Sequence, residues 1–72
     1  MNEDMKALVA ATLEDGGNFT EVARAVRNEY GYGLRDSCFF AAKCVKDLAA
    51  QGHALAAALW VRIQGKNLAG GA

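Results

Sequence analysis

The chain has 72 residues, no proline, and eight lysine and arginine residues balanced by eight acidic ones, so its formal net charge is zero. This length predicts one domain, and an apolar content of 53% favours a folded helical protein over a disordered one. A balanced charge argues against a dedicated nucleic-acid binder, which is usually clearly basic. Because a core of this size stabilises a fold only marginally, we also expect self-association into a homo-oligomer.

The first predicted helix begins near Asn2, a good capping residue followed by two acidic side chains. One face of it carries residues at helical spacing, namely Met5, Leu8, Val9, Thr12 and Leu13. The pair Gly16-Gly17 is expected to end this helix, because glycine is common just after a helical C-terminus.

The second predicted helix begins at Asn18, and Glu21 stands three residues later, as in a capping box. Its predicted buried stripe consists of Phe19, Val22, Ala23, Val26 and Tyr30. Gly31 is expected to end the helix, and Gly33 to supply the positive φ of a tight Gly-Tyr-Gly turn. This turn is the centre of a predicted helical hairpin.

The third predicted helix runs from about Leu34 to Gln51 and is stopped by Gly52. Advancing 100° per residue from Leu34 gives a predicted core stripe of Leu34, Cys38, Ala41, Val45, Leu48 and Ala49. Phe39 and Phe40 fall on the polar side instead, on either side of Lys43. Two large aromatic side chains on the polar side of a helix require an explanation, because each exposes apolar area to water.

Two interpretations of these phenylalanines remain open. In the first, the helix is packed on more than one side by other helices and both rings are buried. In the second, they form a docking surface, because aromatic and arginine side chains are common interface anchors. The predicted partner-binding residues are then Tyr32, Arg35, Phe39, Phe40, Lys43 and Lys46.

The charges are unevenly distributed along the chain. Residues 1–21 carry five acidic side chains and one basic one, whereas residues 22–46 carry five basic side chains and two acidic ones. A basic middle segment favours a protein partner with an acidic surface.

A fourth segment, from His53 to Gln64, has a density of alanine that favours helix. Leu55, Leu59 and Ile63 lie on one face of it. Residues 59–64 also alternate in a way that is compatible with a short strand. Gly65 is expected to close the segment, which gives a single domain over residues 1–65 and a flexible tail over residues 66–72.

The residues with catalytic or metal-binding potential are few. Cys38 and Cys44 are six positions apart on one helix, about 9 Å along its axis, which is too far for a disulfide. Free thiols, with no signal peptide or membrane-length apolar run, predict a cytoplasmic protein. With His53 as the single histidine, the spacing matches no nucleophile–base pair and no zinc pattern. We therefore expect no enzyme activity, no cofactor and no metal site.

Two segments resemble known families. Gly17-Asn18, Glu21 and the run Val22-Ala23-Arg24-Ala25-Val26 resemble the first helix of a helix-turn-helix, which implies a nucleic-acid-binding regulator. The similarity ends at the turn, because this helix continues to Tyr30 where a DNA reader needs a short turn.

The longer run from Val22 to Asp36 resembles the helix–Gly-Leu-Gly–helix segment in the C-terminal domain of the bacterial ribosomal stalk protein, with Tyr32 in place of leucine. That domain docks translation factors, so the resemblance implies a helical hairpin and a protein-binding role.

Together these observations predict an all-α bundle of three to four helices that acts as a non-catalytic protein-binding module. By analogy with other chains of this size, we expect an accessory protein or a phage-encoded inhibitor, similar to anti-CRISPR proteins, that occludes a host protein. The alternative is a helix-turn-helix-like nucleic-acid-binding regulator.

Overall fold

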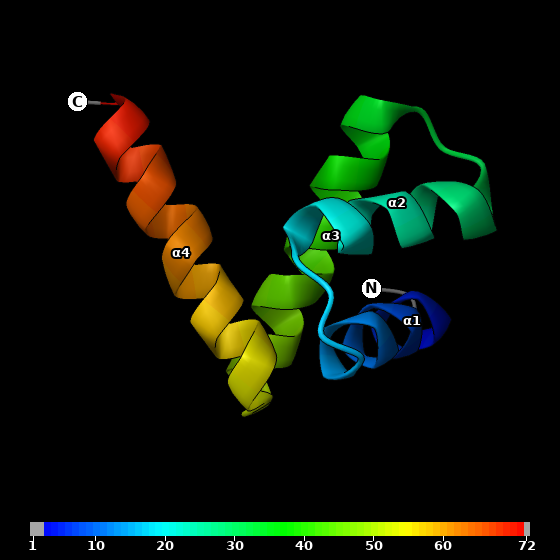
Figure 1. The fold of residues 1–72 in the computed structure, drawn as a ribbon, viewed down its shortest axis with the longest axis horizontal. Coiled ribbons are helices and arrows are strands. Elements are labelled where there is room, and N and C mark those ends of the chain that lie inside the picture. Colours follow the sequence, from blue (N-terminus) through cyan, green and yellow to red (C-terminus); the bar gives the residue numbers. More distant parts are fainter. Residues whose placement is uncertain (1–2, 72) are drawn as a thin grey trace.

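The structure is a computed structural model that describes the backbone of residues 3–71 and the side chains of residues 3–65. The described backbone forms four helices and no strand, in the order α1 (Glu3–Glu14), α2 (Phe19–Tyr30), α3 (Leu34–Ala50) and α4 (Ala54–Gly71) (Figure 1). The predicted all-α bundle is confirmed. The strand considered for residues 59–64 is wrong, because these residues lie within α4.

The helix α3 is the centre of the bundle and contacts each of the other three helices. Figure 1 shows α1 and α2 on one side of it, while α4 leaves the end of α3 and diverges from it like the second arm of a V. Val61, near the middle of α4, is 68% exposed. No helix in the described part of the chain has the length and apolar content required to cross a bilayer.

The core is formed by one stripe from each helix. Its buried members are Met5, Val9, Leu13, Val22, Ala23, Val26, Ala41, Cys44, Val45, Leu48, Ala56 and Leu59. The stripes predicted for the first two helices agree with this core in part: Phe19 and Tyr30 are partly buried and pack against it, whereas Leu8 and Thr12 are half-buried and lie outside it. Leu34, which was predicted to be buried, is 65% exposed. It opens α3 beside Gly31 and Gly33, which are themselves exposed and have no side chains with which to cover it.

The start of α2 is closed by the predicted capping box. The Glu21 N–H donates to Asn18 Oδ1 at 2.9 Å, and the Asn18 N–H donates to Glu21 Oε1 at 3.4 Å. Two of the helix's otherwise unsatisfied N–H groups are thereby bonded. Asn2, the predicted cap of α1, lies outside the described residues.

The connection between α2 and α3 differs from the prediction. Gly31 has φ +74° and its N–H donates to the Arg27 carbonyl at 2.8 Å, whereas Gly33 has φ −67° and ψ 168°. The positive φ therefore belongs to Gly31, and the assignment to Gly33 is wrong. A left-handed residue ends the helix, and the chain then reaches α3 in an extended conformation. The tight Gly-Tyr-Gly turn is not confirmed.

The predicted end of the fourth helix at Gly65 is also wrong, because α4 continues to Gly71. Gly65 does not have the positive φ found at Gly16, Gly31 and Gly52. A glycine in a helical conformation costs about 1 kcal/mol relative to alanine, but it does not by itself end a helix. The domain boundary at residue 65 and the flexibility of residues 66–72 stay predictions, and Ala72 lies outside the described backbone.

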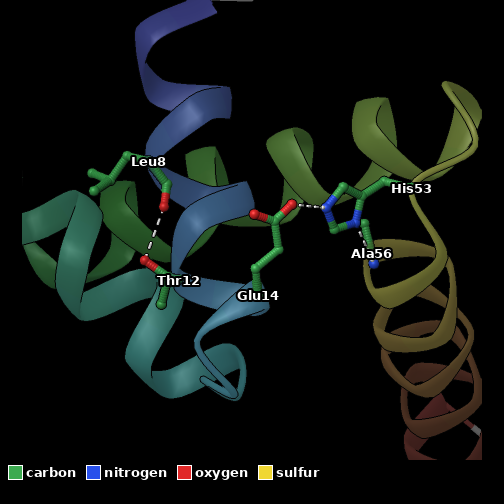
Figure 2. A network of polar contacts seen from close by, with 5 residues as sticks. All are labelled: Leu8, Thr12, Glu14, His53 and Ala56. Carbon is green, nitrogen blue, oxygen red and sulfur yellow. Dashed lines mark hydrogen bonds and ion pairs between the residues drawn. The ribbon is translucent and has the colours of Figure 1, made fainter.

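One side chain links the first and fourth helices across the bundle. His53 precedes α4, and its Nδ1 accepts a hydrogen bond from the Ala56 N–H at 3.2 Å. Its Nε2 lies 3.2 Å from Glu14 Oε2 at the end of α1 (Figure 2). Because Nδ1 accepts, a neutral ring carries its proton on Nε2 and donates it to the carboxylate. His53 is thus both a helix cap, as expected near a helix start, and a link to α1.

A candidate protein-binding surface

The outward face of α3 carries a large exposed ring. Phe39 is 55% exposed, and it lies about 160° around the helix axis from Ala41, a fully buried residue. Phe40, one position later, is half-buried and packs against the core. The first interpretation, in which both phenylalanines are buried between helices, is therefore wrong for Phe39.

Four aromatic rings form a continuous aromatic row that ends at Phe39. Tyr30 and Tyr32 stack with ring centroids 6.0 Å apart, Tyr32 and Phe40 are 4.9 Å apart, and Phe40 meets Phe39 edge-on at 5.5 Å. Such pairs contribute roughly 0.5–1.5 kcal/mol each beyond the area that they bury. Partial burial, and then the Asp4 carboxylate, raise the pKa of Tyr30 above its ordinary value.

The basic residues predicted for the surface are in two environments. Lys43 Nζ lies 5.1 Å from the centre of the Phe39 ring, a cation–π contact that contributes roughly 0.5–1 kcal/mol at an exposed site. Arg35 is exposed one turn before Phe39 on the same side of α3. Lys46 instead places Nζ 6.0 Å from the ring of Trp60 on α4. The six predicted residues therefore divide into a group around Phe39 and one lysine beside α4.

Five cations on α2 and α3 have no carboxylate partner in the described part of the chain. The two ion pairs there are Lys6–Glu3, at 3.1 Å, and His53–Glu14. Neither includes the basic side chains of α2 and α3, which are Arg24, Arg27, Arg35, Lys43 and Lys46. Their charges are therefore available to an external acidic group.

A groove between α2 and α3 was not predicted from the sequence. It has a volume of about 290 Å³ and is lined by Phe19, Thr20, Ala23, Arg24, Arg27, Leu34 and Cys38. The periodicity of each helix shows which residues share its face, but not which face of α2 lies beside which face of α3. The one available signal was an apolar residue, Leu34, at the start of a helix and close to Gly31 and Gly33.

The two cysteines are free thiols, as predicted, and differ in burial. Cys38 is half-buried in the groove, whereas Cys44 is fully buried in the core. Burial, and then the Asp47 carboxylate, raise the pKa of the Cys44 thiol above 9.0. Among the described residues, no three His, Cys, Asp or Glu side chains gather in a way that could hold a metal ion.

No protein-family model, curated protein or solved structure matches this chain. Its function is therefore inferred from the surfaces of α2 and α3.

Proposed function

We propose that this protein is a non-catalytic protein-binding module that docks through the outward face of α3. The docking surface consists of Tyr32, Arg35, Phe39, Phe40, Lys43 and Lys46. The observation that carries the proposal is Phe39, a large ring that is 55% exposed on a helix whose opposite side forms the core. Arg35 and Lys43 flank it without a carboxylate partner among the described residues.

The energetics of this surface favour binding. Full burial of a phenylalanine side chain contributes roughly 1.5–3 kcal/mol, and aromatic residues beside arginine are the usual centres of interface energy. The edge-on contact with Phe40 restrains the ring, so less rotamer freedom is lost when a partner covers it. The extended connection at Tyr32 joins the two arms of the proposed α2–α3 hairpin and supplies the ring that supports Phe40.

The partner that fits this surface is a protein with acidic side chains around an apolar pocket. An acidic rim would pair with Arg35 and Lys43, and the pocket would accept Phe39. We further propose an accessory or inhibitory role in which the bound chain covers a working surface of its partner. A phage-encoded, anti-CRISPR-like inhibitor, an intracellular location and a homo-oligomeric state all stay predictions.

The test is affinity capture with the tagged chain from a cell lysate at physiological salt, with and without nuclease. We expect one protein to be retained in stoichiometric amount after nuclease, and to be lost with Phe39→Asp. Val61→Asp is the matched control, because Val61 is equally apolar and 68% exposed but lies on α4. Both variants must show the helical circular dichroism of the original chain. Retention of the partner by Phe39→Asp would contradict the proposal.

Nucleic-acid binding is the second candidate, and the observation that favours it is the pair of exposed, unpaired arginines on α2, Arg24 and Arg27. It predicts recovery of nucleic acid and loss of captured proteins on nuclease treatment. It also predicts that Arg24→Ala and Arg27→Ala weaken binding, and that affinity falls steeply as salt is raised.

A further inference from the structure

The groove between α2 and α3 combines an apolar floor with a basic rim. Phe19, Ala23, Leu34 and Cys38 contribute the floor, and the two arginines of α2 contribute the rim. Leu34 is the most telling member, because it is 65% exposed and lies in a groove of about 290 Å³. A leucine left open to water in this way contributes little to folding and is available for contact with a partner.

The rim is suited to carboxylates. Arg24 and Arg27 are three residues apart on α2 and therefore project on the same side of that helix. Both are exposed, and neither takes part in an ion pair in the described part of the chain. A guanidinium group presents paired N–H donors that match the two oxygens of a carboxylate. The charge required of an occupant is therefore negative.

This groove is separate from the docking surface. Around the axis of α3, Leu34 and Cys38 lie about 140° and 100° from Phe39. A single segment bound in the groove would not cover Phe39, so a ligand of the groove is a function beyond the one proposed above.

We propose that the groove binds an acidic amphipathic helix of a partner protein. Apolar side chains at helical spacing would lie against Phe19 and Leu34, and Asp or Glu side chains at the edge of that stripe would pair with Arg24 and Arg27. This is the helix-in-groove mode of recognition, in which the apolar stripe gives affinity and the flanking charges give orientation.

Other occupants fit less well. A nucleic-acid backbone would meet the arginines but leave the apolar floor unfilled. A small ligand is normally 70–90% buried in its pocket, which an open groove with an exposed Leu34 does not provide. A second copy of this chain fits less well, because its acidic segment has no exposed large apolar side chain within the described residues 3–21, and its exposed Val61 and Phe39 stand beside Arg62 and Lys43.

The test is a selection from a displayed library of random 16-residue peptides against the whole chain, with counter-selection against the double variant Arg24→Glu/Arg27→Glu. We expect enriched peptides that carry two or more Asp or Glu residues beside apolar residues at helical spacing. In fluorescence anisotropy with one labelled peptide of this type, each single charge reversal should weaken binding at least tenfold. Arg62→Glu is the control, because Arg62 is an exposed arginine on α4 outside the groove.

The position of the peptide is read from Cys38. An occupied groove should slow alkylation of Cys38, measured by mass spectrometry, while the fully buried Cys44 serves as the internal reference. Phe39→Asp should leave the affinity for the peptide unchanged, even though it should abolish retention of the protein captured from the lysate.

Four outcomes would overturn this inference, and the first three concern the groove alone. They are enrichment of no sequence or of basic sequences, binding that ignores both charge reversals, and binding of a short DNA duplex through Arg24 and Arg27 in place of any peptide. A peptide lost with Phe39→Asp and unable to protect Cys38 would also overturn it, while leaving the proposed docking surface intact. Failure of the two proposals is therefore distinguishable.

Discussion

Replacing His53 by alanine should destabilise the fold by about 1–2 kcal/mol. The substitution removes the acceptor that caps the Ala56 N–H, and loss of a capping side chain typically costs about 1 kcal/mol. It also removes the link to Glu14, whose side chain is 64% exposed, so that contact contributes only about 0–1 kcal/mol. The total is a substantial part of the 5–15 kcal/mol that stabilises a typical domain.

The assay is thermal and urea unfolding followed by circular dichroism. For a chain of this size, 1 kcal/mol shifts Tm by roughly 4–8 °C. His53→Asn separates the two contributions, because asparagine is a strong helix cap but is too short to be expected to reach Glu14. We expect His53→Asn to recover most of the loss, and Glu14→Gln to cost little because an amide oxygen still accepts from Nε2.

Two results would refute this reasoning. If His53→Ala unfolds at the same midpoint as the original chain, neither contact stabilises the corner between α3 and α4. If His53→Asn and Glu14→Gln both lose as much stability as His53→Ala, the link to α1 supplies most of the stabilisation and the helix cap supplies little.

Three further predictions concern the backbone, the core and pH. Gly31→Ala should cost about 1–2 kcal/mol because φ is +74° there. Gly33→Ala should cost less, about 0.5 kcal/mol, since φ is −67° and a Cβ would meet nothing within 4 Å, so only the preference of a helix N-cap for glycine over alanine is lost; equal loss in both, measured by urea unfolding, would contradict this. Leu48→Ala should cost about 2–4 kcal/mol because the side chain is buried in the core, and a Tm change below a few degrees would show that the core tolerates the cavity. Burial raises the pKa of the Cys44 thiol above its ordinary value of 9.0. The folded chain therefore keeps a proton that the unfolded chain releases, and the free energy of unfolding falls as pH rises above about 9. Between about pH 8 and 10, the Tm of Cys44→Ala should fall less than the Tm of the original chain.

The helices and their starting points could be predicted because their signals are local. Asn18 and Glu21 are three residues apart, and their reciprocal bonds depend on little beyond the first turn of α2. The glycines were less predictable. Whether a glycine ends a helix depends on its φ, which follows from the path that the next element takes, and Gly65 continues a helix where Gly31 ends one.

The surfaces could be predicted only in part. Periodicity placed Phe39 on the side of α3 opposite the core stripe, and it is exposed. Periodicity also placed Leu34 in the core, which is wrong. Periodicity indicates the direction in which a side chain points, but it does not indicate whether another helix extends far enough to cover that side chain. The link between Glu14 and His53 spans 39 positions of sequence, so no local pattern could have revealed it.

The exposed apolar residues of α3 are hard to explain by folding. Lysine or glutamate at Phe39 would have a higher helix propensity and would not expose a ring to water. A polar residue at Leu34 would likewise cost nothing in the core, since Leu34 lies outside it. Each of these residues instead stands beside cations that have no carboxylate partner among the described residues. An apolar group ringed by free charge of one sign is a poor contributor to folding and a good binding anchor, which is why both proposals rest on α3.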